Sequence, residues 1–282
     1  MFYLYHKKSG DFANKSVRKL GRNLQTKKIG HTGILDPLAS GLMLIATESD
    51  TRTLEYIENK DKTYIASATF NLSSDTLDIT GNVVKNSFDK VLKKTLENAL
   101  DEIKKTKTQQ PPIYSAKKIN GKKAYEYARN DKFVEIPKQK IEIYDLELLD
   151  FNFEKQTFEI KTRVSEGTYI RTLLYDIAKL CNNICVMKKL IRTNIGTLSL
   201  EGIQENELKK IDDIRKLFNA NFVQLNPIWI NDLLNGRTIK MNFSEGLTFI
   251  FSTKINEICC VGFIKDNIFH PKKVFKERLN YE

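Results

Sequence analysis

The segment KTYIASATF, at residues 62–70, alternates apolar and polar side chains. Tyr64, Ala66, Ala68 and Phe70 fall at every second position, which is the side-chain period of a β-strand with one buried face. The segment therefore predicts a half-buried strand. The fold class depends on what accompanies this strand along the rest of the chain.

Similar strand patterns occur on both sides of it. The alternation of Ile141 with Ile143 and of Phe158 with Ile160 indicates half-buried strands that pair in antiparallel fashion. Strands are predicted at residues 2–5, 62–70, 141–149, 158–164, 247–253 and 258–264. The first four predict a mixed, mainly antiparallel central sheet, and the last two lie near the C-terminus.

Helical patterns lie between the strands. The strongest has an apolar stripe with a spacing near 3.6, beginning with Phe88 and Val91 behind a possible Ser87 cap. Helices are predicted at residues 16–25, 50–58, 87–103, 170–181 and 206–218. Separate runs of strands and helices predict an α+β fold, in which helices flank the central sheet.

The pattern changes after Asn226 and Pro227, where short strands separated by turns follow one another. A chain of 282 residues is long enough for one main domain and a smaller one. We therefore predict a main domain at residues 1–224 and a small C-terminal β domain at residues 225–282.

Positive charge is concentrated in two stretches. The net charge of +11 comes from 46 Lys and Arg residues against 35 Asp and Glu residues. Residues 104–140 have 11 basic and 3 acidic side chains, residues 6–29 have 8 and 1, and the remainder has a net charge of −4. Such segregation indicates a polyanion-binding face better than it indicates lysines that merely solvate a surface.

The cysteines and histidines do not form a metal-binding pattern. No Cys-x-x-Cys pair occurs and the three histidines are scattered, so buried free thiols are expected and no structural zinc. No apolar run approaches the roughly 20 residues that cross a bilayer, and the N-terminus is unlike a secretory signal. We expect a cytoplasmic protein that needs neither a metal nor another cofactor.

The segment GHTGILDPLASG, at residues 30–41, is a candidate catalytic loop. Its three glycines let a ligand approach the backbone closely, and Pro37 restricts Asp36 to extended conformations. An aspartate is ionised at neutral pH, so it can act as a nucleophile without an activating base. An ordinary Asp-Pro turn is the alternative interpretation.

The segment SEGTYIRT, at residues 165–172, lies between a predicted strand and a predicted helix. Arg171 falls in the first helical turn, where the helix dipole disfavours a cation. An anion should therefore compensate it, either a phosphate or Asp36, and an Arg–carboxylate fork would keep Asp36 charged and oriented. An ordinary surface arginine is the alternative.

The segment QPPIYSAKKINGKKAYEYAR, at residues 110–129, interleaves tyrosines with five positive charges. Basic and aromatic side chains together suit contact with an RNA backbone and stacking on RNA bases. The tyrosines are Tyr114, Tyr125 and Tyr127. The expected RNA contacts are Lys117, Lys118, Lys122 and Lys123.

Taken in order along residues 1–200, these segments resemble the TruB family of tRNA pseudouridine synthases, which act on uridine 55 of the T arm. GHTGILDPLASG is similar to the family's catalytic motif and places Asp36 at the nucleophile position. Lys62-Thr63-Tyr64 is similar to its second motif, in which Tyr64 would stack on the target base. GTYIRTLLYD contains the arginine that pairs with the aspartate in this family, here Arg171.

Further motifs extend the resemblance. SDTLDITG, at residues 74–81, resembles the family's Asp-Thr-x-Asp-x-x-Gly stretch, and residues 104–140 resemble its RNA-gripping insertion. Leu190 and Arg192 belong to a Leu-x-Arg-Thr-x-x-Gly motif, in which Leu190 would pack beneath the target base. His31 matches a histidine that is inserted when the base is flipped, so it would take the place of the expelled base or stack beside it. Tyr169 and Arg192 are further expected RNA contacts.

Two regions match the family less well. Residues 7–12 read KKSGDF where the family has Lys-Pro-x-Gly followed by Thr or Ser, which leaves the geometry of this loop open. The region from residue 225 is only weakly similar to the family's small PUA-type RNA-binding domain.

The resemblance implies a pseudouridine synthase fold and an isomerase that converts uridine to pseudouridine in tRNA. The target base would be flipped out of the RNA, Asp36 would attack either the ribose C1′ or the uracil C6, and Arg171 would orient Asp36. The expected partner is tRNA; no protein partner is required, and a monomer is expected. One alternative is a non-catalytic RNA-binding or RNA-folding protein. Another is an RNA-cleaving enzyme that holds Mg²⁺ with Asp75 and Asp78, although with Gly81 these residues fit a turn more simply.

Overall fold

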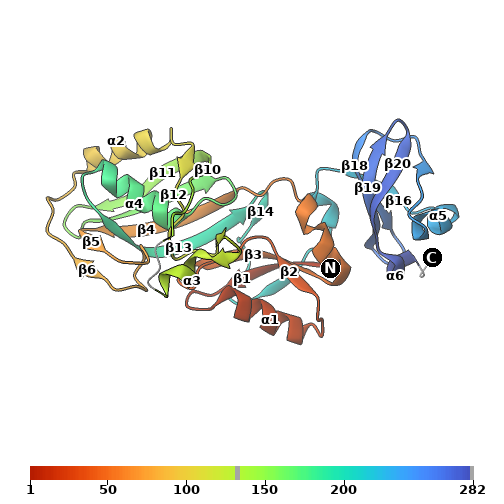
Figure 1. The fold of residues 1–282 in the computed structure, drawn as a ribbon, viewed down its shortest axis with the longest axis horizontal. Coiled ribbons are helices and arrows are strands. Elements are labelled where there is room, and N and C mark those ends of the chain that lie inside the picture. The colour runs from red at the N-terminus through yellow and green to blue at the C-terminus, as the bar shows by residue number, and fades with distance from the viewer. Residues whose placement is uncertain (131–133, 280–282) are drawn as a thin grey trace.

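The computed structural model describes residues 1–130 and 134–279, and its main element is a nine-stranded sheet (Figure 1). The strand order is β11-β12-β4-β13-β3-β1-β15, with β14 paired to β13 and β2 paired to β3. The strands are β1 (Phe2–Lys7), β2 (Ile29–His31), β3 (Ser40–Thr47), β4 (Lys62–Phe70), β11 (Ile143–Asn152), β12 (Thr157–Val164), β13 (Cys185–Ile195), β14 (Leu198–Ser199) and β15 (Leu208–Lys210). Within the described residues, β13 and β3 pair in parallel and the other pairs in this sheet are antiparallel.

β4 has the bounds that its side-chain alternation predicts and lies between β12 and β13. Its buried side chains alternate with half-buried ones along its full length. Phe70, at the end of β4, stacks on Phe158 of β12 with ring centroids 4.7 Å apart. The alternation therefore identifies the side of the strand that faces the core.

Three helices cover one face of this sheet: α1 (Ala13–Asn23), α2 (Lys93–Ile103) and α4 (Ile170–Leu180). Their apolar sides share one core with the strands, to which Val17, Leu96 and Leu174 each contribute a buried side chain. This arrangement confirms the predicted α+β class. In the parts of the chain that the structure describes, no helix is long and apolar enough to cross a membrane.

The basic insertion projects from the base formed by β7 (Thr108–Gln109) and β10 (Gln139–Lys140), which pair with each other. Inside it, β8 (Lys118–Ile119) and β9 (Lys122–Lys123) form a hairpin that leads into α3 (Ala124–Ala128). Asn120 and Gly121 turn the hairpin with φ angles of +49° and +82°, as a tight two-residue hairpin turn requires. A second small hairpin pairs β5 (Leu72–Ser73) with β6 (Val84–Lys85).

A five-stranded sheet forms the C-terminal part of the molecule (Figure 1). Its strands are β16 (Asn221–Gln224), β18 (Gly246–Ser252), β19 (Glu257–Lys265), β20 (Ile268–Val274) and β17 (Ile239–Lys240), in that spatial order. η3 (Pro227–Trp229), α5 (Ile230–Leu234) and α6 (Lys276–Leu279) accompany it. Because β16 belongs to this sheet, the sheet begins four residues before residue 225.

The two sheets share a hydrophobic core. Phe2, Leu42 and Leu44, from strands β1 and β3, are buried together with Phe249 of β18. Phe218 lies between the sheets, with its ring centroid 5.8 Å from that of Phe2 and 4.5 Å from that of Phe249. The C-terminal sheet therefore covers the face of β1 and β3 that the helices leave free.

A buried ion pair joins the same two parts. Asp50, in the 3-10 helix η1 (Glu48–Tyr56), accepts two hydrogen bonds of 2.9 Å from Arg278 of α6, and both side chains are about 5% exposed. Arg278 also donates to the backbone oxygen of Ile258 at 2.7 Å, and the N-terminal ammonium of Met1 donates to Asp50. Burial by itself would raise the pKa of Asp50, but the hydrogen bonds and charge of Arg278 hold it below its ordinary value.

The helix predicted at residues 87–103 begins later than expected. α2 starts at Lys93, and Phe88 is exposed and lies outside it. Gln156, in the turn before β12, accepts from the backbone N–H of Val91 at 2.8 Å and donates to its oxygen at 3.3 Å. The backbone N–H and oxygen of Val91 therefore bond to Gln156 and not within a helix. The prediction that Ser87 caps this helix is wrong, because α2 begins six residues later, at Lys93.

The helix predicted at residues 206–218 is also wrong. This segment forms β15, which pairs with β1 on the side away from β3, and then the short 3-10 helix η2 (Ile214–Leu217). The free edge of β1 recruits Leu208 through backbone hydrogen bonds that the local sequence does not reveal. The helix predicted at residues 50–58 is the 3-10 helix η1, and α1 begins at Ala13 with no side-chain cap from Phe12.

Asp50→Asn should destabilise the protein in a pH-dependent way. Because the folded state lowers the pKa of Asp50, its contribution is complete above the ordinary pKa of about 3.9 and is lost as the pH falls through the folded-state value. At pH 7 we expect the free energy of unfolding to fall by about 3 kcal/mol, since a buried charge loses its partner. Urea unfolding between pH 3 and pH 7 measures this difference.

The difference between wild type and Asp50→Asn should shrink below about pH 4, where unfolded Asp50 takes up a proton that folded Asp50 still resists. Asp101→Asn, at an exposed ion pair on α2, is the matched control and should behave as the wild type does. A difference that stays constant across this pH range would contradict the electrostatic explanation.

Candidate active site

The segment 30–41 forms a hydrogen-bonded loop between β2 and β3. The backbone N–H of Thr32 donates to Leu44 at 3.2 Å, and that of Ala39 donates to the oxygen of Asp36 at 3.1 Å. The side chain of Asp36 is 34% exposed. The loop therefore presents one carboxylate, partly open to solvent, from a backbone that is held at both ends.

A buried lysine supports this loop from below. Lys7 of β1 is fully buried, and its ammonium donates to the backbone oxygens of Lys8 at 2.8 Å, Pro37 at 3.3 Å and Ala39 at 2.6 Å. Burial lowers the pKa of Lys7 to about 8. Lys7 therefore fixes the backbone on the C-terminal side of Asp36.

Arg192 of β13 supports the other side of the loop. It is fully buried, and it donates to the oxygen of Leu42 at 2.7 Å and to that of Gly33 at 3.2 Å. The sequence predicts Arg192 as an RNA contact, but its burial under the loop leaves it no surface to offer to RNA. Its hydrogen bonds assign it instead to positioning the loop.

Gly41 lies where β3 pairs in parallel with β13, opposite Arg192, and has a φ angle of +117°. A Cβ atom added at Gly41 would lie 2.3 Å from the backbone oxygen of Arg192 and 2.6 Å from its nitrogen. No backbone atom can yield at such distances without separating the strands. Glycine is therefore required at this position on steric grounds.

Arg171 connects the loop to two other segments. Its side chain is 5% exposed, and its Nε donates to Oδ2 of Asp36 at 2.9 Å. Its other nitrogens donate to the backbone oxygens of Thr76 at 2.7 Å and Tyr114 at 2.9 Å. The anion expected beside Arg171 at the start of α4 is thus Asp36.

Asp78 is a second carboxylate beside Arg171, with its Oδ2 at 3.8 Å from Nε. It is buried, and its Oδ1 accepts from Thr76 Oγ1 at 2.8 Å and from the N–H of Thr80 at 2.9 Å. Asp75 instead accepts backbone N–H groups within the same turn. The sequence analysis favoured a turn here over an Mg²⁺ site of Asp75 and Asp78, and it missed the proximity of Asp78 to Arg171.

Neighbouring strands place Tyr64 and Leu190 near the loop. Tyr64 of β4 is the cross-strand partner of Arg192, and Leu190 is that of Ala66. Both side chains are buried. Burial raises the pKa of the Tyr64 phenol above its ordinary value, the charge of Arg192 opposes this shift, and the charge of Asp36 adds to it. Tyr64 is therefore a neutral phenol within electrostatic reach of Asp36.

Two further predicted site residues, His31 and Tyr169, come from distant segments of the chain. His31, at the end of β2, is half-buried, and burial together with the charge of Arg192 lowers its pKa. Its Nδ1 is buried and has no hydrogen-bond partner among the described residues. Tyr169, just before α4, exchanges two backbone hydrogen bonds, of 2.8 and 3.1 Å, with the side chain of Gln109 at the base of the insertion.

The four lysines predicted to contact RNA differ in their surroundings. Lys118 and Lys122 are exposed on the hairpin. Lys117 is half-buried and donates to the side-chain oxygen of Gln139 at 2.9 Å, and Lys123 lies 5.5 Å from the centroid of the Tyr125 ring. The first two are therefore free to meet an external anion, whereas Lys117 and Lys123 also contact the insertion itself.

The sequence prediction missed the buried lysines Lys7 and Lys62. Lys62 is 3.8 Å from Glu166, its side chain is 7% exposed, and burial lowers its pKa to about 8. The signal was present, because Lys7 continues the inward series of Tyr3 and Tyr5 in β1, and Lys62 begins the series of β4. Strand alternation could thus have identified both as inward-facing cations.

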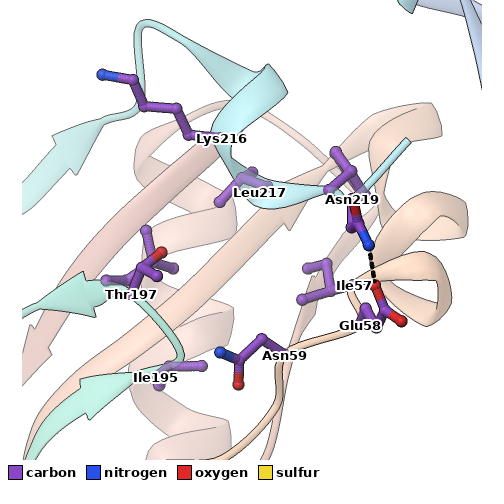
Figure 2. Close-up of a pocket in the computed structure, with 10 residues that line it drawn as sticks. Ile57, Glu58, Asn59, Ile195, Thr197, Lys216, Leu217 and Asn219 are labelled. Carbon is purple, nitrogen blue, oxygen red and sulfur yellow. Dashed lines mark hydrogen bonds between the residues drawn. The ribbon is translucent and has the colours of Figure 1, made fainter. Parts of the chain in front are cut away.

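A cavity of about 250 Å³ lies apart from these residues (Figure 2). Its lining comes from the end of η1, the turn after β13, and η2, and Asn219 donates to Glu58 across one side at 2.9 Å. None of the predicted site residues lines it. Among the described residues, no three His, Cys, Asp or Glu side chains form a group that could hold a metal ion.

The chain is similar to proteins of one family over most of its length. The family model described as TruB family pseudouridylate synthase (N terminal domain) matches residues 21–170. The chain is 36% identical over 254 residues to tRNA pseudouridine synthase B of Mycoplasma mobile, covering 90% of this chain and 87% of that protein. It is 33% identical over 282 residues to the protein of the same name from Aquifex aeolicus, covering 96% and 98%.

Solved structures show the same fold at lower sequence identity. The chain superposes on a chain of a Cbf5-Nop10-Gar1 complex with a TM-score of 0.67, at 18% identity, covering 99% of this chain and 86% of that one. It superposes on a chain of an H/ACA RNP bound to a substrate RNA containing 2′-deoxyuridine with a TM-score of 0.63, at 17% identity, covering 97% and 84%. At this identity the likeness concerns the fold alone.

Gly41→Ala should destabilise the protein by about 3 kcal/mol or more, because the added Cβ meets the backbone of Arg192 in addition to the strain of a positive φ. Gly202→Ala is the matched control: its φ is +72° and nothing lies within 4 Å of the added Cβ, so about 1 kcal/mol is expected from strain alone. Urea unfolding measures both changes in the free energy of unfolding. Equal changes would contradict the close approach of β3 to the backbone of Arg192 in β13.

Proposed function

The chain belongs to the TruB family of pseudouridylate synthases, and on this premise we propose that it acts on the uridine at position 55 in the T arm of tRNA, with Asp36 as its nucleophile. The family reaction, conversion of a uridine in tRNA to pseudouridine, is an isomerisation. The observation that carries the proposal for Asp36 is its hydrogen bond to the buried guanidinium of Arg171.

The reaction breaks the bond between uracil N1 and ribose C1′ and forms a bond between C5 and C1′. A proton leaves C5 and another is taken up at N1, so no atom is lost. Asp36 attacks either C1′ or C6 of the target nucleotide, and both routes need an ionised carboxylate aimed at the base. The guanidinium of Arg171 stabilises that charge and holds the carboxylate in one direction.

The neighbouring aromatic and apolar side chains suit a flipped base. A uridine inside a stem-loop must leave its stack before Asp36 can reach it, and the lost stacking has to be replaced. Tyr64 would stack on one side of the uracil and Leu190 would pack beneath it. Because its pKa is raised, Tyr64 would meet the base as a neutral phenol. The phenol would lie near C5, from which a proton must be removed at the end of the reaction.

His31 would occupy the space from which the base is expelled. Its lowered pKa favours the neutral imidazole at neutral pH, and a neutral ring stacks between bases without the desolvation penalty of a charge. The exposed Lys118 and Lys122 would contact phosphates of the T arm, while Lys117, Lys123 and Tyr169 would shape the insertion around it.

The domain assignment belongs to the same proposal. Residues 1–224 would be the catalytic domain, with residues 104–140 as its RNA-gripping insertion, and residues 225–282 would be a small PUA-like RNA-binding domain. The enzyme would act as a monomer in the cytoplasm, where its tRNA substrate is found, and it would need no cofactor for an isomerisation without a redox step.

Asp36→Asn should abolish pseudouridine formation while the Kd for RNA stays within about threefold of wild type, because the substitution removes the nucleophile and little of the binding surface. Pseudouridine mapping in a T-arm stem-loop incubated with the purified protein measures turnover, with and without a chelator. Asp75→Asn is the matched control, since Asp75 serves its own turn, and it should retain activity. Appreciable turnover by Asp36→Asn would refute the assignment.

A further inference from the structure

Helix α1 has two faces of different character. Its buried side chains are small or apolar, apart from one serine: Ala13, Ser16, Val17, Leu20 and Gly21. Its solvent face repeats cations at helical spacing, and two more follow in the turn to β2. These six exposed residues form what we call the α1 track: Lys15, Arg18, Lys19, Arg22, Lys27 and Lys28. The helix contains no acidic residue.

The α1 track forms no salt bridge with any acidic group of residues 1–130 and 134–279. Helix α2 is different, because its Lys93 and Lys94 each lie 4.0 Å from its Glu97. Like charges three or four residues apart destabilise a helix, and a lysine in the first turn, such as Lys15, also opposes the helix dipole. An external polyanion would relieve both penalties.

The α1 track begins beside the loop at residues 30–41 that carries Asp36, which we call the nucleophile loop. In the segment that precedes α1, the N–H of Gly10 donates to the oxygen of Pro37 at 2.8 Å and the hydroxyl of Ser9 donates to that of Leu38 at 2.7 Å. Arg171 joins the insertion to the same loop, because it donates both to the backbone oxygen of Tyr114 and to the carboxylate of Asp36. The nucleophile loop is thus linked to the basic insertion by one set of contacts and to α1 by another.

The track ends beside the C-terminal sheet. An α-helix of 11 residues is about 16 Å long, so Arg22 lies well away from the loop at which α1 starts. Beyond α1, the N–H of Glu48 donates to the oxygen of Lys28 at 2.8 Å, and Ser49 donates to Glu277 of α6. In Figure 1, α1 runs along the lower side of the molecule, beneath β1 and β2.

We infer that the α1 track is a second RNA-binding surface, which takes the phosphate backbone of a tRNA segment outside the stem-loop that presents the target uridine. This inference rests on the proposed function for the identity of the RNA. A stem-loop that delivers one base to Asp36 occupies the nucleophile loop and the insertion, whereas the track leads from there to the C-terminal sheet. Contacts of lysine and arginine with phosphates position an RNA without reading its sequence.

The test compares a full-length tRNA transcript with the isolated T-arm stem-loop. In one variant, Lys15, Arg18, Lys19 and Arg22 are each replaced by Gln. Its Kd for the transcript at about 0.1 M salt should rise tenfold or more, and the slope of log K against log salt should flatten by roughly 0.9 for each lost phosphate contact. Its Kd for the stem-loop should change less than twofold. Its melting temperature should equal or exceed that of the wild type, because the substitutions remove repulsion within α1.

Two further variants serve as controls. Lys93→Gln with Lys94→Gln removes exposed charge from α2 and should leave both Kd values unchanged. Lys118→Gln with Lys122→Gln removes charge from the insertion and should weaken the binding of both RNAs.

Wild-type affinity of the fourfold variant for the transcript would overturn the inference. Equal weakening for both RNAs would overturn the assignment to a segment outside the stem-loop. Failure of the proposed function is separately visible: the wild type would then form no pseudouridine in the T arm, whatever the affinity of the α1 variant for the transcript.

Discussion

The ion pair between Arg171 and Asp36 is the contact on which the geometry of the site depends. A guanidinium with 5% of its side chain exposed has lost nearly all of its hydration, so it must be satisfied by the protein. Thr76, Tyr114 and Asp36 supply its hydrogen bonds, and Asp78 supplies a second negative charge. Because these partners come from three segments far apart in the sequence, the loop at residues 30–41, the turn at residues 74–81 and the insertion cannot move independently of Arg171.

Buried cations hold the backbone of the loop at residues 30–41 on both sides of Asp36. Lys7 binds the carbonyls on one side of Asp36, and Arg192 binds those of Gly33 and Leu42 on the other. Both cations are fully buried, so their hydrogen bonds to the loop are not weakened by competition with water. Catalytic groups that are fixed before the substrate arrives need no reorganisation during the reaction, which is the basis of electrostatic preorganisation.

The features that could be predicted are those that depend on neighbouring residues in the sequence, such as side-chain alternation and position within a helix. The alternation of β4 gave its bounds and buried face, and the unfavourable place of Arg171 in the first turn of α4 indicated a nearby anion. The inward-facing Lys7 and Lys62 were equally readable from strand alternation, although the prediction passed over them. Charge counts located the two basic segments, and only the structure separates the exposed Lys118 from the hydrogen-bonded Lys117.

Features that depend on distant contacts could not be predicted. The start of α2 is set by Gln156, and the strand at residues 208–210 forms because it pairs with the side of β1 that β3 leaves open. Arg192 seemed suited to RNA, since nothing in its own sequence context shows that a loop 150 residues away would cover it. Propensity and periodicity are local quantities, and a long-range hydrogen bond or a covering loop can outweigh both.

The most direct test of the role of Arg171 is the single-turnover rate of pseudouridine formation by Arg171→Lys at saturating enzyme. Lysine keeps the charge, but it cannot hold Asp36, Thr76 and Tyr114 in the fixed geometry of the guanidinium. The rate should fall about 100-fold or more while the Kd for the T-arm stem-loop stays within about threefold, because a misplaced nucleophile slows the chemical step much more than it weakens binding. A rate within threefold of the wild type would show that the ion pair with Arg171 does not position the nucleophile.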